Sequence, residues 1–309
     1  MLKVRVIPTL LWKQFGLVKG VGFDSWRRVG PVLPAIKVYN QREVDELVLV
    51  DIVAHQSDDD PDFESIGEFG QDCFVPLTVG GGITRIGQVQ RLLRAGADKV
   101  AVNTAAYTHP DLVNQIASRH GVQCVVASID VRAQDGGWTC FSHAGQRATG
   151  RDVVAWAREL EDRGAGEILI TSIERDGTMQ GYDLALVEAV VNSVKIPVIA
   201  SGGAGNYQHM VDAVTHAGAS AVAAACAVYL PLARAEAALA RIEKALPGPL
   251  QEERVLLQAR LLMARADHAA AAELLRTLPP ESSAVARFNL GVALVKAGDL
   301  PQGMALLDV

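Results

Sequence analysis

Short, continuously apolar segments recur along the first three quarters of the chain, and amphipathic segments separate them. Strands are predicted at Val4–Leu10, Glu46–Ile52, Val75–Val79, Lys99–Val102, Gln123–Asp130, Glu167–Thr171, Pro197–Ala200 and Ala221–Ala224. Runs without polar–apolar alternation are typical of parallel strands that are buried on both faces. Helices are predicted between them at Thr84–Ala95, Pro110–His120, Asp152–Arg163, Asp183–Val194 and Tyr207–Ala217.

This alternation predicts an α/β protein of the (β/α)8 barrel class. Eight strands with helices after them, in about 245 residues, match such a barrel in count and size. An open doubly wound sheet is the competing topology, but eight regular units without a long insertion favour the barrel. The predicted domains are a barrel over residues 1–247 and a helical extension over residues 248–309.

The barrel sequence also repeats itself. Val75–Gly82 resembles Ile196–Gly203 at an offset of 121 residues, and Ala95–Val100 resembles Ala217–Val222 at an offset of 122. An offset of half the barrel predicts two similar half-barrels of four strands each. Such a molecule carries two equivalent sites that are related by a pseudo-twofold axis.

Residues 248–309 form a separate Ala- and Leu-rich region that follows Gly248 and Pro249. A pattern returns there after 32 residues, and small residues that would let helices approach closely occur at Ala259, Ala271, Gly291 and Gly303. The region resembles tetratricopeptide repeats, although their signature Trp and Tyr are absent. A simple helical hairpin is the alternative. Two units are fewer than a solenoid needs, so we expect an incomplete array, or a tail that docks on the barrel or on another protein.

Charge, hydropathy and cysteine content exclude several classes of protein. The net charge is −6 with no run of Lys or Arg, which argues against a nucleic-acid or anionic-membrane partner. No apolar stretch reaches membrane-spanning length, and the N-terminus lacks the features of a signal peptide. The four cysteines are scattered outside any CxxC pair, and the histidines show no metal-ligand spacing. We therefore expect a reduced, cytoplasmic protein without a metal.

Two glycine-rich segments are the first candidates for a binding site. Val79–Ile83 and Ala200–Gly205 each follow a predicted strand and precede a predicted helix. Glycines at such turns let backbone N–H groups approach an anion, and a helix N-terminus adds favourable potential. The alternative is that they only form tight turns. Two copies at equivalent half-barrel positions favour a ligand with two phosphates, one held by each half.

Acidic residues at strand ends are the second set of candidates. Asp130 and Asp51 each close an apolar run, and Asp176 lies just beyond the sixth predicted strand. A carboxylate at the C-terminal end of a barrel strand points into the mouth, where active sites of such barrels lie. Helix capping or a loop salt bridge is the alternative role for Asp51 and Asp176. Asp130 is the strongest candidate, because an apolar strand rarely ends in an acid without a function.

Together these segments identify a resemblance over about residues 1–230. The barrel resembles the cyclase subunit of imidazole glycerol phosphate synthase, from histidine biosynthesis. The segments that carry the resemblance are Arg5–Pro8, Leu17–Val21, Asp45–Ile52, Val79–Ile83, Gly96–Val100, Asn103–Ala106, Ser128–Asp130, Gly164–Ile168, Thr171–Thr178 and Ala200–Gly205.

The resemblance implies a reaction, a partner and a set of site residues. A glutaminase docked at the N-terminal face supplies ammonia. Ammonia and a phosphoribulosyl-formimino aminoimidazole carboxamide nucleotide with two phosphates give imidazole glycerol phosphate and aminoimidazole carboxamide ribotide, without a cofactor. Asp130 is the implied catalytic residue, and Lys19 lies on an implied mobile loop that closes over the substrate. The implied substrate- and phosphate-binding residues are Lys19, Asp51, Gly81, Gly82, Asn103, Thr104, Thr171, Ser172, Asp176, Gly177, Gly202, Gly203, Ala225 and Cys226.

The family's ammonia gate is a ring of alternating charges at the bottom of the barrel. Its positions fall on Arg5, Glu46, Lys99 and Glu167, which all have the expected charge. Four charges at strand starts are costly to bury unless they pair with one another. A purely structural ring of ion pairs is therefore the alternative.

The chain departs from the family pattern at the end of the first strand. Leu11 occupies the place of an acid that the family pairs with Asp130, and Thr9, Trp12 and Cys226 are also changed. Losing a general acid or base typically costs about 10²–10⁴-fold in rate. Three hypotheses follow: the family reaction with Asp130 alone or a recruited neighbour, a paralogous ammonia-using amidotransferase for surface-polysaccharide sugars, or an inactive scaffold that binds partners through its tail.

Overall fold

The computed structural model describes residues 4–13, 16–54, 60–134 and 136–225, and in the C-terminal region 255–256, 258–259, 262–263, 267–279 and 284–307. The chain divides into two compact units, Met1–Leu230 and Pro231–Val309. The domain boundary predicted between residues 247 and 248 falls outside the described residues.

The first unit is a closed barrel of parallel strands, as predicted. Each barrel strand pairs in parallel with the next, and β10 pairs with β7 to close the ring. The barrel strands are β1 (Arg5–Lys13), β4 (Leu47–Asp51), β5 (Leu77–Gly80), β6 (Lys99–Val102), β7 (Val125–Gln134), β10 (Glu167–Ser172), β11 (Val198–Ser201) and β12 (Ala221–Ala224). The strand predictions therefore hold within a few residues at their ends.

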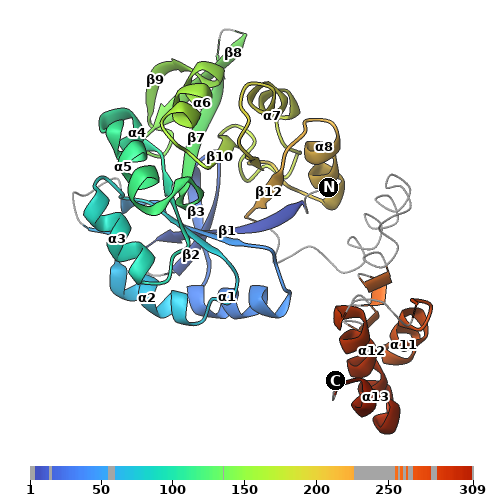
Figure 1. Ribbon diagram of the computed structural model, residues 1–309. Coiled ribbons are helices and arrows are strands. Elements are labelled where there is room, and N and C mark those ends of the chain that lie inside the picture. The colour runs from blue at the N-terminus through green and yellow to red at the C-terminus, as the bar shows by residue number, and fades with distance from the viewer. Residues whose placement is uncertain are drawn as a thin grey trace. The chain divides into compact units, whose positions relative to one another are not determined.

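Helices surround the strands (Figure 1). They are α1 (Val32–Gln41), α2 (Phe63–Gln71), α3 (Ile86–Arg94), α4 (Thr104–Thr108), α5 (Asp111–His120), α6 (Val153–Asp162), α7 (Leu184–Val191) and α8 (Tyr207–Thr215), with a 3₁₀ turn at Val122–Cys124. Side-chain caps start several of them: Asp152 accepts a hydrogen bond from the Ala155 amide, and Asp183 accepts one from the Leu186 amide. All five predicted helices are present, and α1, α2 and α4 are additional.

Strand register reproduces the pseudo-twofold repeat. Ile168 of β10 pairs with Val198 of β11, and Leu47 of β4 pairs with Leu77 of β5. Both members of the second pair lie 121 residues before their counterparts, which is the offset of the sequence repeat. The two half-barrels therefore match in backbone pairing as well as in sequence.

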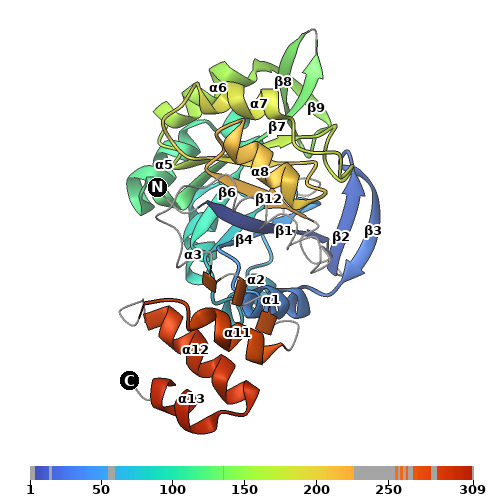
Figure 2. The ribbon, with the colours of Figure 1, turned by 90° about the vertical axis from the view of Figure 1, so that its right-hand side faces the viewer.

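Two β-hairpins follow the ends of β1 and β7, and Figure 2 shows both on the same side of the barrel. One hairpin consists of β8 (Gly137–Ser142) and β9 (Arg147–Asp152), which pair in antiparallel fashion. The other hairpin corrects a prediction, because Lys19 lies not on an irregular loop but in β2 (Gly16–Val21), which pairs with β1 and with β3 (Asp24–Gly30). Closure of this segment over the substrate stays a prediction. A Cβ atom on Gly20 would lie 2.4 Å from the Asp24 carbonyl oxygen, so that glycine permits close pairing of the hairpin strands.

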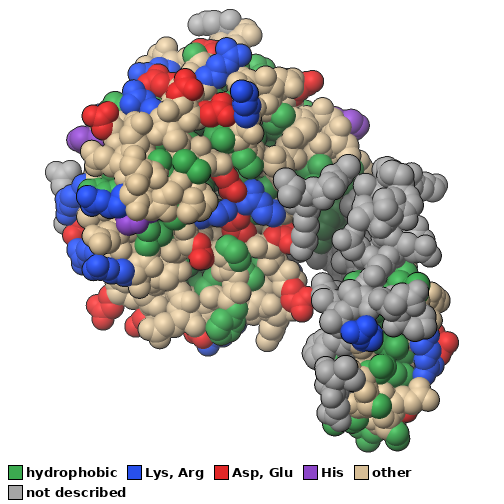
Figure 3. All heavy atoms as spheres, in the orientation of Figure 1, with side chains coloured by type: hydrophobic (Ala, Val, Ile, Leu, Met, Phe, Trp, Pro, Cys, Tyr) green, Lys and Arg blue, Asp and Glu red, His purple; other side chains and the backbone are tan. Residues whose placement is uncertain are grey.

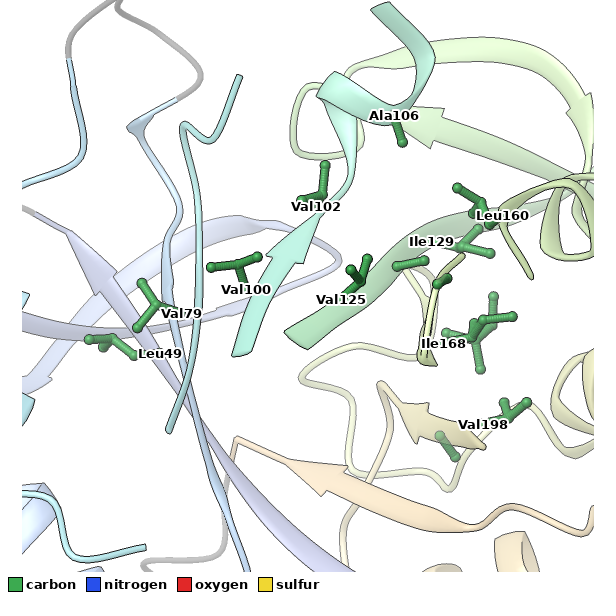
Figure 4. Packing of buried hydrophobic residues seen from close by; sticks show 14 of the residues in the cluster. Leu49, Val79, Val100, Val102, Ala106, Val125, Ile129, Leu160, Ile168 and Val198 are labelled. Atoms are coloured by element: carbon green, nitrogen blue, oxygen red, sulfur yellow. The ribbon is translucent and has the colours of Figure 1, made fainter. Parts of the chain in front are cut away.

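The core has two layers. Outward-facing strand residues pack against the helices, and Figure 4 shows Leu49, Val79, Val100, Ile129 and Ile168 among them. Inward-facing residues fill the barrel itself: Ile7, Val48, Ala101, Val126, Leu169, Ile199, Ala221 and Ala223. The inner layer separates the two ends of the barrel, and polar groups lie at each end.

The second unit contains α11 (His268–Leu275), α12 (Ala284–Ala297) and α13 (Leu300–Leu307). Small and aliphatic residues form its core, among them Ala271, Ala293 and Leu294. A Cβ atom on Gly303 would lie 2.9 Å from the Gly291 carbonyl oxygen and 2.6 Å from a methyl group of Val295, so α12 and α13 approach closely there. These consecutive helices agree with the helical extension predicted for this region. Its relation to tetratricopeptide repeats stays a prediction.

Charged side chains of both signs lie on the visible surface of the barrel (Figure 3). On the face in Figure 3, Lys and Arg side chains are interspersed with Asp and Glu over the barrel. None of the helices in the described ranges combines the length and the apolar character needed to cross a bilayer.

Candidate active site at the mouth of the barrel

A cavity of about 580 Å³ opens at the C-terminal ends of the barrel strands. This volume lies within the range of about 300–1,000 Å³ that is typical of small-molecule sites. Every barrel strand, or the residue that follows it, contributes to the lining: Leu11, Asp51, Gly80, Asn103, Asp130, Thr171, Ser201 and Ala224. The cavity therefore occupies the place where barrels of this kind hold their substrates.

Most of the predicted substrate-binding residues line this one cavity. They are Asp51, Gly81, Gly82, Asn103, Thr104, Thr171, Asp176, Gly177, Gly202, Gly203 and Ala225, together with the predicted catalytic residue Asp130. Lys19 and Ser172 are not among the described lining residues. Ser172 is 4% exposed and pairs with Val131, and Lys19 pairs with Arg27 in the β2–β3 hairpin. Cys226 lies outside the described residues.

The two glycine turns have equivalent geometry. Gly81 and Gly202 both adopt positive φ angles, of 106° and 85°. A Cβ atom on Gly81 would lie 2.3 Å from the Asp51 carbonyl oxygen, and one on Gly202 would lie 2.6 Å from that of Ser172. Only glycine fits at either position, because both the backbone conformation and the close approach exclude a side chain. We call the two turns, Gly81–Gly82 and Gly202–Gly203, the glycine cradles.

Asp130 is the most deeply buried carboxylate of the cavity. Its side chain is 7% exposed, and its Oδ2 atom accepts a hydrogen bond of 2.6 Å from Asn103 Nδ2. Burial, and to a smaller extent the negative charge of Asp176, raise the pKa of Asp130 to about 7, against the opposing effect of the Asn103 hydrogen bond. Asp130 can therefore exist in both protonation states near neutral pH, as a proton-transfer group requires.

The other two predicted acids differ from each other. Burial raises the pKa of Asp176 to about 6, against a hydrogen bond from the Gly177 amide. Asp51 instead accepts hydrogen bonds from the Val53 and Ala54 amides, at 2.9 and 3.1 Å. The Asp51 carboxylate thus holds the turn after β4, and its role in substrate binding stays a prediction.

Strand register shows which residue is the counterpart of Asp130 in the other half-barrel. Asp130 pairs with Thr171, whose sequence counterpart 121 residues earlier is Val50. Val50 pairs with Leu11. Leu11 therefore holds the position in the first half-barrel that Asp130 holds in the second, and its side chain lines the same cavity.

Two buried polar atoms of the cavity lack a hydrogen-bond partner within the described part of the chain. They are Thr9 Oγ1 and Asn103 Oδ1, and both residues line the cavity. An unpaired buried polar group costs about 1–3 kcal/mol, so both atoms are available to a ligand or to water. Sequence reasoning noted Thr9 only as a changed position. Thr9 lies two residues before Leu11 on the same strand, and alternate residues of a strand share one face. This spacing could have indicated that Thr9 faces the same cavity as Leu11.

Four alternating charges close the opposite end of the barrel. Arg5 Nη1 lies 2.7 Å from Glu46 Oε2 and 2.9 Å from Glu167 Oε1. Lys99 Nζ lies 3.1 Å from Glu46 Oε2 and 3.2 Å from Glu167 Oε2. The Thr78 hydroxyl also donates a hydrogen bond of 2.8 Å to Glu46. Each charge thus contacts two of opposite sign, which satisfies all four in one layer. We call these four residues the charge ring.

Comparison with known proteins agrees with this arrangement. The family model described as "Histidine biosynthesis protein" matches residues 5–231. The chain belongs to this family. It is 47% identical over 244 residues to the imidazole glycerol phosphate synthase subunit HisF of Hyphomonas neptunium (strain ATCC 15444), covering 78% of this chain and 97% of that protein. The histidine biosynthesis family match ends where the first compact unit ends, within one residue, so the C-terminal helices lie outside it.

Proposed function

We propose that the barrel is the cyclase subunit of an imidazole glycerol phosphate synthase. It would combine ammonia with the phosphoribulosyl-formimino aminoimidazole carboxamide nucleotide, giving imidazole glycerol phosphate and aminoimidazole carboxamide ribotide. The observation that carries this proposal is the placement of two equivalent glycine cradles and a buried, proton-exchanging Asp130 around one cavity. Identity of 47% to a synthase subunit favours this reading over a paralogous amidotransferase or an inactive scaffold.

The glycine cradles would hold the two phosphates of the substrate. Gly81–Gly82 lies beside Asn103 and Thr104, and Gly202–Gly203 lies beside Ala225 on the lining of the same cavity. Backbone N–H groups in such turns bind anions without a charged side chain. The reacting centre of a bisphosphate held at both ends would then lie between them, near Asp130.

A binding measurement tests this placement. Without ammonia the substrate does not turn over, so its affinity can be measured by calorimetry. Gly81→Val and Gly202→Val are each expected to weaken binding by about 100-fold or more, because their side chains would collide with a backbone carbonyl group. Gly87→Val in α3 is the matched control, since no atom lies within 4 Å of a Cβ at that position. Loss of affinity in only one of the two variants would indicate a single phosphate site.

The charge ring end of the barrel is the proposed docking face for a glutaminase. Three large apolar residues are exposed just before barrel strands begin: Val4 before β1, Phe74 before β5 and Val122 before β7. Phe74 is 80% exposed, and its backbone is held by a hydrogen bond of 3.2 Å from its amide to Asn40 Oδ1. A rigidly presented, exposed aromatic residue is typical of an interface anchor.

Phe74→Ala is therefore expected to separate two activities. Glutamine-dependent turnover with a partner glutaminase should require about 30-fold more partner, because an anchor residue contributes about 2 kcal/mol or more to binding. Ammonium-dependent turnover should stay unchanged, since Phe74 lies outside the cavity lining. Leu300→Ala, at a residue 57% exposed on the C-terminal unit, is the matched control. Equal partner affinity in wild type and Phe74→Ala would contradict the proposed face.

A further inference from the structure

Replacement of the family acid by Leu11 raises the question of which group transfers the second proton. Among the described residues that line the cavity, the titratable and charged side chains are Asp51, Arg85, His109, Asp130, His143 and Asp176. Addition of ammonia to a carbonyl group needs one group that gives a proton and one that takes a proton. Asp130 can serve as one of these groups.

Most of the remaining side chains are engaged elsewhere. The Asp51 carboxylate accepts hydrogen bonds from two backbone amides, and Arg85 forms an ion pair with Asp60. His109 Nδ1 lies 3.0 Å from the Thr108 hydroxyl, and the His109 side chain is exposed. His143 Nδ1 lies 2.9 Å from the buried Ser142 hydroxyl. The Asp176 carboxyl group accepts a hydrogen bond from one backbone amide, that of Gly177, whereas Asp51 accepts two. Apart from Asp130, Asp176 is therefore the cavity carboxyl group that is less engaged by the backbone.

The backbone holds Asp176 in place from two sides. Its amide donates hydrogen bonds to the carbonyl groups of Ser172 and Ile173, at 3.0 and 3.2 Å. Its carbonyl oxygen accepts a hydrogen bond of 3.0 Å from the amide of Gly22, in the turn of the β2–β3 hairpin. Asp176 therefore sits where the end of β10 meets this hairpin, on the wall of the cavity that also contains Asp130.

We propose that Asp176 is the second proton-transfer residue of this chain and acts with Asp130 in place of the acid that Leu11 replaces. This inference rests on the proposed function. In the step considered, the nitrogen lone pair of ammonia forms a bond to the carbonyl carbon of the ribulosyl group. The π electrons of the carbonyl move to its oxygen, which takes a proton from the protonated carboxyl group. The new ammonium nitrogen gives a proton to the carboxylate of the other residue, so the pair holds the same number of protons before and after.

The electrostatics of the pair support this assignment. The negative charge of Asp176 contributes to raising the pKa of Asp130, so the two carboxyl groups interact inside the cavity. Burial raises the pKa of Asp176 to about 6. Two interacting carboxyl groups in one site lose their protons in sequence, so one holds a proton while the other is ionised. Near neutral pH, the cavity thus supplies a proton donor and a proton acceptor together.

The test compares Asp176→Asn in two backgrounds, with ammonium and the nucleotide as substrates. In the wild-type background, kcat should fall by about 10²–10⁴-fold while KM for the nucleotide changes less than about threefold. The limb of the pH profile between about pH 5 and 7 should also disappear. Leu11→Asp should raise the wild-type rate. In the Leu11→Asp background, Asp176→Asn should lower kcat by less than about tenfold, because the restored carboxyl group at position 11 can transfer the proton instead. Asp111→Asn, on an exposed side chain of α5, is the matched control.

The outcomes separate this inference from the proposed function. Wild-type turnover that survives Asp176→Asn would overturn the inference and leave the proposed function intact. An equal loss in both backgrounds would also overturn it, since Asp176 would then have a role that an acid at position 11 cannot replace. No wild-type or Leu11→Asp turnover at all would overturn the proposed function itself. Should Asp176→Asn fail to fold, Asp176→Glu is expected to retain the acidic limb of the pH profile, and loss of that limb would count against the inference.

Discussion

Asp130→Asn is expected to lower kcat by about 10²–10⁴-fold while leaving the fold intact. The amide keeps the shape of the carboxyl group and can keep a hydrogen bond with Asn103, but it cannot exchange a proton. The measurement is the rate of imidazole glycerol phosphate formation with saturating ammonium and nucleotide. Wild-type rates in this variant would remove Asp130 from the mechanism.

The same substitution should change the pH dependence of stability. The pKa of Asp130 rises from 3.8 to about 7 on folding, so the folded state binds more protons than the unfolded state between these values. The free energy of unfolding of the wild type should therefore fall as the pH rises through that window. Asp130→Asn removes this term and should be more stable than the wild type by on the order of 2–4 kcal/mol at about pH 8, with no such gain at about pH 4.

Urea unfolding at the two pH values checks this prediction independently of turnover. Asp111→Asn serves again as the control, because its exposed carboxylate should shift stability little at either pH. A variant that is less stable than the wild type at about pH 8 would show that ionised Asp130 is better solvated in the folded protein than its burial indicates.

Glu46→Ala is expected to be the most destabilising substitution in the charge ring. Glu46 is 2% exposed and contacts both Arg5 and Lys99, so its loss leaves two cations at the base of the barrel with Glu167 alone. Removing one partner of a buried ion-pair network costs about 3–5 kcal/mol. The free energy of unfolding in urea measures this loss.

A surface carboxylate with similar partners provides the control for the charge ring. Glu159 also interacts with two arginines, Arg151 and Arg163, but its side chain is 34% exposed. Glu159→Ala should therefore cost less than about 1 kcal/mol. Similar losses of unfolding free energy in both variants would indicate that burial does not strengthen the ion pairs of the charge ring. That result would contradict a closed, structured gate at this end of the barrel.

The barrel could be predicted from sequence because its strands are buried on both faces. Continuous apolar runs identified all eight, and their spacing identified the closed topology. The β2–β3 hairpin could not be predicted because its strands are short, charged and rich in glycine. In the structure, Gly16 and Gly20 permit close pairing of these strands. Helix α1, which begins at Val32 without a side-chain cap, was also not predicted.

The site could be predicted only in part. Glycine turns and acids at strand ends have local signals, so Gly81, Gly202, Asp51, Asp130 and Asp176 were found. Pairwise geometry has no such signal. Three contacts depend on side-chain direction, which the sequence does not specify. Asn103 donates a hydrogen bond to Asp130, Asp51 holds its own turn, and Ser172 is buried away from the cavity.

The central claim is that this barrel joins ammonia to a bisphosphate nucleotide despite Leu11, and the most direct measurement is product formation by the purified chain. The nucleotide and ammonium are supplied at mildly alkaline pH, where part of the ammonium is free ammonia, and both products are quantified. The account predicts imidazole glycerol phosphate and aminoimidazole carboxamide ribotide in equal amounts, at a rate that Asp130→Asn abolishes. Tight binding of the nucleotide without either product, in the wild type and in Leu11→Asp alike, would contradict it.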